Sequence, residues 1–274
     1  MYLSGKQVLT GPPAKIFRRA VGIIRNPFTE LEEFKDECSM RNPRFSEGND
    51  LVRFQLERDL RPLDEEIMDA TLNLAGYFNM LRGETTLTGK YDLIAAPGGA
   101  RRAPLHRACA AAQSIVEGRV DAKILVIAGS TRLLKDEEKP IVQDYAPDAV
   151  TEYDLCFGAS LRILEKYPTL PVYTVRTDNP NAGNDDVIDR VMDFYHEEFP
   201  ESGPISVAMV TTRHYAVGLH LDMARAAKRH GWRNFLAAGH CVDPETLFNR
   251  SMMIYFSECL TTLRKAAIAA AEDC

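Results

Sequence analysis

From residue 91 onwards, short apolar runs alternate with longer stretches in which apolar and polar residues recur at helical spacing. The apolar runs cover residues 93–96, 124–128, 172–175, 205–210 and 235–238. Candidate helices lie between them at about 103–117, 149–166, 185–198 and 215–230. Continuous apolar strands separated by helices are typical of a parallel sheet that is covered on both faces. The pattern predicts an α/β fold with a Rossmann-like, doubly wound, mostly parallel five-stranded sheet.

Residues 1–90 have a helical and irregular pattern instead. Thr29 and Glu32 have the spacing of a capping box, which predicts a helix to about Cys38. Further helices are expected at 50–60, at 64–81 with Gly83 closing it, and at about 244–272. We therefore expect two parts. Residues 1–90 form a helical N-terminal extension that acts as a lid or a dimer surface, and residues 91–274 form the Rossmann-like domain with a long C-terminal helix.

The composition narrows the classes of partner. Lys and Arg number 33 and Asp and Glu number 39, which gives a net charge of −6, and hydrophobic residues make up 45% of the chain. A mildly acidic globular chain lacks the basic face of a general nucleic-acid binder. No apolar run approaches the roughly 18 residues of a membrane span, and the six cysteines show no disulfide spacing. We expect a cytoplasmic protein with neither nucleic-acid nor membrane partners; a homo-oligomer remains open.

The ends of the predicted strands carry the candidate chemistry, because ligands of such sheets bind at the carboxyl ends of the strands. Nearly every strand ends in Gly, a hydroxyl residue, Arg or His, and together these endings predict a polar crevice. The candidate ligand-binding residues are Gly98, Gly99, Arg101, Arg102, Gly129, Ser130, Thr131, Arg132, Thr177, Asn179, Thr211, Thr212, Arg213 and His240.

The first strand end is the best candidate for binding an anion. Gly98 and Gly99 allow a tight turn and a close approach to backbone N–H groups, and Pro104 suits the first turn of the following helix. The amino end of a helix favours an anion, and Arg101, Arg102 and the nearby Arg107 match phosphate or carboxylate geometry. The alternative is a simple turn with solvated arginines.

His214 is the candidate acid or base, since it lies between a strand end and a helix start. Glu138 and Glu152 are the candidate carboxylate partners. Each residue also has a structural interpretation: a buried His, a solvated charge run around Glu138, and a carboxylate that complements a helix dipole at Glu152. For Ser130 and Thr131, capping or turn formation competes with ligand binding.

Several common sites are disfavoured. The dinucleotide fingerprint lacks its third glycine and its ribose-binding acid, and the chain has neither a GxxxxGK[ST] loop nor a G-x-S-x-G elbow. The His and Cys positions give no metal-ligand spacing, so we expect no metal site.

Three segments resemble the YdcF/SanA/ElyC-like superfamily of bacterial Rossmann-like proteins. They are residues 93–99, residues 124–129 with Glu137 or Glu138 downstream, and residues 210–215, where Thr-Thr-Arg-His is similar to the family's T-S-x-x-H. Val217 replaces an Arg that the family usually has, and Ser130 replaces the second glycine of a pair. The resemblance implies the soluble branch of the family, with S-adenosylmethionine or a nucleotide-like molecule as the ligand.

Together these observations predict an enzyme that binds a phosphorylated or nucleoside-bearing small molecule at the strand ends. The expected reaction is hydrolysis or group transfer at a phosphate ester or glycosidic bond. Two alternatives remain open: a transferase that uses S-adenosylmethionine as its cofactor, and a non-catalytic sensor of a nucleotide ligand or interaction protein.

Overall fold

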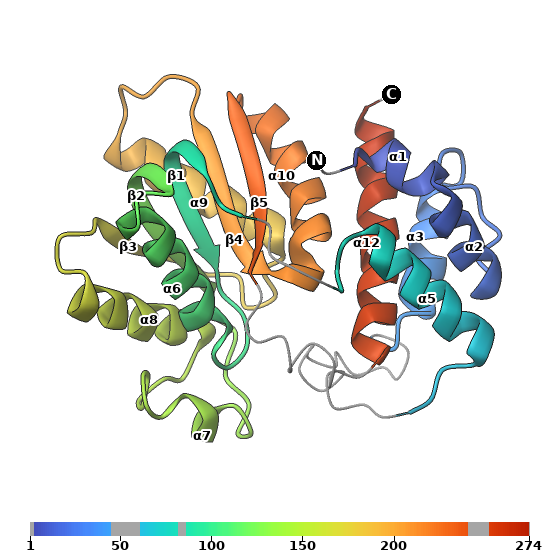
Figure 1. Cartoon of the computed structure of the whole chain (residues 1–274), viewed down its shortest axis with the longest axis horizontal. Coiled ribbons are helices and arrows are strands. Elements are labelled where there is room, and N and C mark those ends of the chain that lie inside the picture. The colour runs from blue at the N-terminus through green and yellow to red at the C-terminus, as the bar shows by residue number, and fades with distance from the viewer. Residues whose placement is uncertain (1–2, 45–60, 82–85, 241–251, 274) are drawn as a thin grey trace. The chain divides into compact units, whose positions relative to one another are not determined.

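The computed structural model describes residues 3–44, 61–81, 86–240 and 252–273. It divides into two compact units (Figure 1). The helical unit comprises Met1–Gly83, Arg213–Arg225 and Cys241–Cys274, and the α/β unit comprises Glu84–Thr212 and Ala226–His240. The predicted helix at 50–60, the predicted start of the last helix at 244 and Gly83 lie outside the described residues.

The α/β unit is built on a five-stranded sheet in which all neighbouring strands are parallel. The strands are β1 (Gly89–Pro97), β2 (Val120–Ser130), β3 (Val172–Thr177), β4 (Ser206–Thr212) and β5 (Asn234–His240), in the spatial order β3-β2-β1-β4-β5. Their buried faces come from the apolar runs that predicted them. The Rossmann-like, doubly wound α/β fold is therefore confirmed, with a sheet that is wholly parallel.

Helices cover both faces of this sheet. Helices α6 (Ala103–Val116) and α8 (Glu152–Lys166) pack against each other on one face, and α9 (Asn184–Glu198) lies on the other (Figure 1). A short helix, α7 (Lys139–Val142), interrupts the connection between β2 and α8. Because β2 and β4 flank β1 on opposite sides, the strand order reverses between β1 and β4. Open α/β sheets bind their ligands at such a switch point, beyond the carboxyl ends of the strands.

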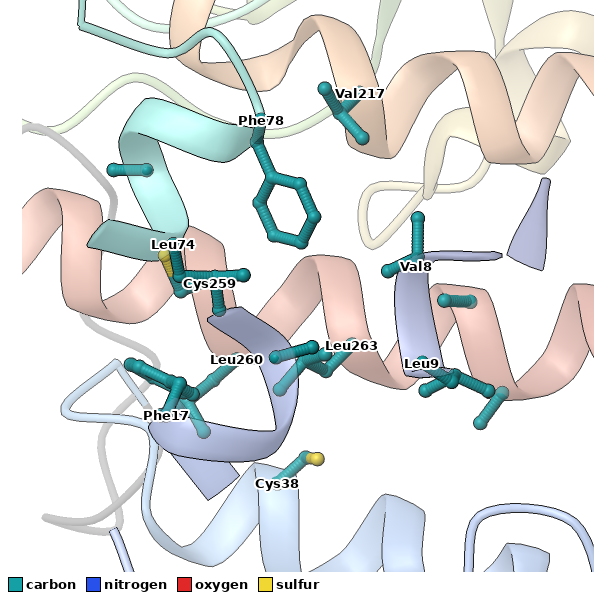
Figure 2. Close-up of a cluster of buried hydrophobic side chains, with 14 of the residues drawn as sticks. Val8, Leu9, Phe17, Cys38, Leu74, Phe78, Val217, Cys259, Leu260 and Leu263 are labelled. Atoms are coloured by element: carbon teal, nitrogen blue, oxygen red, sulfur yellow. The ribbon is translucent and has the colours of Figure 1, made fainter. Parts of the chain in front are cut away.

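The helical unit buries a continuous apolar core around α12 (Met252–Glu272). The other elements are α1 (Gly5–Thr10), α2 (Pro12–Ala20), α3 (Leu31–Met40), α5 (Glu65–Tyr77), the 3₁₀ turn η1 (Arg213–Tyr215) and the first part of α10 (Ala216–His230). Figure 2 shows Leu260 and Leu263 of α12 among side chains from α1, α2 and α5, including Phe17 and Leu74. Fully burying one such side chain contributes about 1.5–3 kcal/mol. Packing thus groups the C-terminal helix with the N-terminal helices, whereas the sequence pattern grouped it with the α/β part.

Two predicted helix ends were wrong. The capping box at Thr29 does not form: α3 begins at Leu31, and its N-cap residue makes no side-chain cap. The Asn26 side chain accepts the Phe28 N–H at 2.9 Å and creates a turn there instead. Helix α5 ends at Tyr77 because Asn79 adopts the left-handed conformation and donates to the Gly76 carbonyl, as in a Schellman motif.

In the described part of the chain, none of the helices is both long and apolar enough to cross a membrane.

Candidate functional site

The β1–α6 turn is tightly constrained. The Gly98 N–H donates to the Ala128 carbonyl at 2.6 Å, and a Cβ on Gly98 would clash with the Glu152 carboxylate. Gly99 has φ 149°, and Arg101 has φ 52°, which is unusual for a residue with a side chain. The first turn of α6 contains Pro104 and no acidic residue, as the sequence predicted. The amino end of α6 therefore keeps its positive dipole next to an accessible glycine pair.

Arg107 holds this turn through hydrogen bonds to its backbone carbonyls. Its buried guanidinium donates to the Pro97 carbonyl at 2.8 Å and also to the Gly98 carbonyl, and it donates to the Thr212 hydroxyl at 3.3 Å. One side chain thus joins the carboxyl ends of β1 and β4, the two strands at the switch point. The sequence suggested Arg107 as an anion donor, whereas the structure shows it binding the protein's own backbone.

Glu138 is a fully buried carboxylate with several hydrogen-bond donors around it. It accepts two hydrogen bonds from the Arg132 guanidinium, at 2.9 and 3.1 Å, and a third from the Lys135 N–H at 3.0 Å. Burial alone would raise the pKa of Glu138, but the bonds from Arg132, from Lys135 and from the backbone of Arg101 lower it below its usual value. A carboxylate held ionised in this way positions other groups.

Glu138 also helps to hold Arg101 in its unusual conformation. The Arg101 backbone hydrogen-bonds to Glu138, and the Arg101 carbonyl accepts the Tyr145 hydroxyl. Residues before and after α7 therefore bind both backbone groups of Arg101, its N–H and its carbonyl, in the β1–α6 turn. Tyr145 was not among the sequence candidates, because its role depends on a contact 44 residues away.

Glu152 and Arg132 form the more accessible part of the network. The Arg132 guanidinium donates to the Glu152 carboxylate at 3.1 Å, and the two side chains are 23% and 14% exposed. Glu152 is the first residue of α8, where Thr151 provides a complete capping box with Asp154. The Glu152 carboxylate lies beside Gly98 and is the more exposed of the two carboxylate candidates at the turn.

The hydroxyl groups after β2 form local turns. The Ser130 hydroxyl accepts the Arg132 N–H at 3.3 Å, and the Thr131 hydroxyl donates to the Asp178 carbonyl at 2.9 Å. Packing requires a glycine at position 129, since a Cβ there would come within 2.7 Å of the Cys156 Sγ atom. The contacts of these residues support their structural interpretation, as turn-forming and packing residues. Their ligand-binding role stays a prediction.

Six further candidates lie in the α/β unit. Thr177, Thr211 and Thr212 are buried at strand ends, Arg102 makes a surface ion pair with Asp144 at 2.8 Å, Asn179 is exposed, and His240 is half-buried at the end of β5.

Arg213 and His214 pack within the helical unit. The Arg213 Nε donates to the Asn79 carbonyl at 2.6 Å. His214 is fully buried beside the rings of Tyr215 and Tyr255. The structure therefore brings the glycine turn, Arg132, Glu138, Glu152 and Thr212 together within one unit, and the catalytic role of His214 stays a prediction.

The N-cap and the first two turns of α6 carry two arginines, Arg102 and Arg107, and a histidine, His106. His106 lies one turn after Arg102, and burial together with the nearby His240, Arg102 and Arg107 lowers its pKa. The i,i+4 spacing of Arg102 and His106 is the sequence signal that could have identified this residue. Within the described residues, no three His, Cys, Asp or Glu side chains are grouped so as to hold a metal ion.

The comparisons with known proteins leave this site without a named counterpart. No family model matches the chain, and no curated protein matches it. Among solved structures, it is similar to chloroplast FtsY from Physcomitrella patens, with 12% sequence identity, 85% of this chain and 83% of that chain covered, and a TM-score of 0.24. A similarity at that score carries no argument about function, so the functional proposal depends on the geometry of the strand ends.

Proposed function

We propose that the chain is an enzyme that binds a phosphorylated or nucleoside-bearing small molecule at the carboxyl ends of its strands. The reaction is hydrolysis or group transfer at a phosphate ester or glycosidic bond. The observation that carries this proposal is the β1–α6 turn, in which Arg101 has φ 52° and is held in place by Glu138 and Tyr145. The resemblance to the YdcF/SanA/ElyC-like superfamily points to the same crevice and remains part of the proposal.

Backbone strain supports a functional role for this turn. The left-handed conformation costs a residue with a side chain about 1–2 kcal/mol. Strained residues concentrate at binding and active sites, where the surrounding structure holds them in place. Here the restraints are a fully buried carboxylate and a tyrosine hydroxyl, which shape the turn directly before the amino end of α6.

The charges around the turn fit an anionic group. The amino end of α6 has no acidic residue and no side-chain cap, and Arg102 stands at its N-cap position with 40% of its side chain exposed. A surface ion pair such as Arg102–Asp144 contributes about 1 kcal/mol or less, so a ligand phosphate can compete with Asp144 for the guanidinium. Phosphate groups bind at helix amino ends through the same N–H groups and dipole.

Glu152 and His214 are the candidates for proton transfer. Glu152 is partly accessible beside Gly98, and Arg132 fixes its orientation. In the proposed reaction, Glu152 protonates the leaving group or removes a proton from the attacking water. The catalytic role of His214, which is fully buried within the helical unit, stays a prediction.

Ligand binding is tested by isothermal titration with ribose 5-phosphate, nucleoside monophosphates and S-adenosylmethionine. Arg102→Ala removes a charged donor, so we expect affinity for the phosphorylated probes to fall about tenfold, which corresponds to about 1.4 kcal/mol. Arg190→Ala is the matched control, because Arg190 is another surface arginine with an acidic partner, Glu197, at 3.6 Å. Failure of every anionic probe to bind would overturn the proposal.

Catalysis is tested separately with p-nitrophenyl phosphate esters and p-nitrophenyl glycosides. We expect Glu152→Gln to abolish turnover while binding of the phosphorylated probes persists, and His214→Ala tests whether His214 takes part in catalysis. Binding without turnover in the wild type would instead identify a non-catalytic sensor. Binding of S-adenosylmethionine alone would favour the transferase.

A further inference from the structure

A pocket of about 190 Å³ lies within the α/β unit, between α6 and the last residues of β4 and β5. The segment that leads into β1 contributes Leu87, and α6 contributes Ala110 and Gln113. The strands contribute Val210, Ala238 and His240. Of the candidate ligand-binding residues predicted from the sequence, His240 lines this pocket, whereas Arg102 and the glycine turn do not.

The pocket adjoins the proposed anion site along β4. Val210 lies two residues before Thr212 on the same face of the strand, which is a distance of about 7 Å at the usual rise per residue. Thr212 accepts from Arg107, the residue that holds the Gly98 turn, and it is paired with His240 across the sheet. A ligand whose phosphate sits at the turn can therefore extend along the strand into the pocket.

The walls of the pocket suit a flat ring with polar edges. Leu87, Ala110, Val210 and Ala238 supply apolar surface. The Gln113 carboxamide donates one N–H to the Glu117 carboxylate at 2.6 Å, and its oxygen and second N–H supply an acceptor and a donor. A cavity of about 150 Å³ accommodates benzene, so this volume corresponds to a single ring system slightly larger than that. Mixed apolar walls with a few oriented polar groups are typical of small-molecule sites.

We infer that this pocket binds the base of a nucleotide whose phosphate is held at the β1–α6 turn. The inference rests on the proposed function and adds recognition of the base, which the turn itself does not contact. Specificity for the ring then comes from Gln113 and His240, and affinity for the phosphate comes from the turn.

The test compares ligands with and without the ring. We expect AMP, GMP, CMP or UMP to bind the wild type at least tenfold more tightly than ribose 5-phosphate in isothermal titration. Ala110→Leu fills the pocket and should abolish that advantage, leaving the affinity for ribose 5-phosphate unchanged. Cys109→Leu adds similar bulk to the neighbouring, exposed position of α6 and should leave both affinities unchanged.

The possible failures are distinguishable. If no nucleotide and no sugar phosphate binds, the proposed function fails and this inference fails with it. If ribose 5-phosphate binds as tightly as every nucleotide, or if Ala110→Leu weakens both classes equally, the inference is overturned while the proposed function stands. Should Ala110→Leu not fold, Gln113→Leu replaces it, with loss of preference among the four nucleotides as the expected result and an unchanged preference as the contrary one.

Discussion

The two ends of the sheet in the α/β unit both carry charged clusters, but they treat the charges differently. At the amino end, Asp92 accepts from Lys123 at 2.7 Å and from Arg233 at 3.1 Å, and the two cations are 60% and 64% exposed. At the carboxyl end, Glu138 is fully buried and its partner Arg132 is 23% exposed. The cations at the amino end are largely exposed to water, whereas Glu138 and Arg132 at the carboxyl end are largely buried.

At the carboxyl end, the arrangement of charges is not explained by stability alone. Exposed ion pairs contribute little, while a buried carboxylate is tolerated only when its hydrogen bonds are complete. The carboxyl end adds a left-handed Arg101 to its buried charges. A region that combines desolvated charge with backbone strain is the expected place for a site.

Glu138→Gln should have the largest effect. Removing the charge leaves the Arg132 guanidinium partly buried without its main partner, and breaking such a pair costs about 3 kcal/mol or more. We expect this loss in the free energy of unfolding measured by urea titration. Asp136→Asn, at an exposed pair with Lys139, should leave it nearly unchanged. Equal effects of the two substitutions would remove the distinction between buried and exposed charge.

The same pair predicts a pH dependence. Because the pKa of Glu138 is lowered in the folded protein, its stabilising contribution is complete above its ordinary value of about 4.5 and disappears as the pH falls through the folded value. The stability difference between wild type and Glu138→Gln should therefore be constant near neutral pH and shrink on acidification below about 4.5. A difference that grows in acid would contradict the assignment.

Arg107→Met should have the next largest effect. It leaves the Pro97 and Gly98 carbonyls without their donor, and one unsatisfied buried acceptor costs about 1–3 kcal/mol. We expect about 2 kcal/mol in urea unfolding together with weaker binding of ribose 5-phosphate, because the turn loses its support. Arg190→Met on α9 is the control, since Arg190 makes a long surface contact with Glu197 at 3.6 Å. Unchanged phosphate affinity in Arg107→Met would separate the turn from the binding site.

Arg101→Gly should act in opposite directions on stability and binding. Glycine adopts a positive φ without strain, so we expect the free energy of unfolding to rise by as much as about 1 kcal/mol while affinity for phosphorylated probes falls. Calorimetric unfolding and ligand titration on the same variant measure both effects. Loss of stability in this variant would show that the backbone at residue 101 is not strained.

Asp92→Asn at the amino end should have the smallest effect. The amide oxygen can still accept the Ser206 N–H, which donates to Asp92 at 2.9 Å, and the lost ion pairs involve exposed cations. We expect a loss of about 1 kcal/mol or less in urea unfolding and no change in ligand affinity. A change in ligand affinity would remove the contrast between the two ends.

Much of the fold could be predicted from local pattern, because each strand is an apolar run between helices. The start of β1 was missed, since Lys90 and Asp92 break the run although the strand begins at Gly89. The glycine turn was predicted from Gly98, Gly99 and Pro104. Contacts between distant segments could not be predicted, because nothing in the local sequence indicates them.

Arg107 and Glu138 illustrate this limit within the site. Arg107 reaches the Thr212 hydroxyl, 105 residues away in the chain, and a sequence pattern cannot distinguish that contact from a solvated arginine. Glu138 follows Glu137 in a charged loop, so its complete burial depends on how residues 132–138 fold back on the turn. The sequence therefore predicts which strand ends are polar, while the partners of each charge require the tertiary structure.

Backbone amide chemical shifts of the full chain during titration with ribose 5-phosphate test the central claim most directly. Amides donate to a bound phosphate at a helix amino end, so we expect saturable shifts that are largest between Gly98 and Leu105. The amino end around Asp92 and Lys123 should remain unchanged and serves as the internal reference. The absence of saturable shifts in the turn, or larger shifts around Asp92 and Lys123, would contradict a phosphate site at the carboxyl end of the sheet.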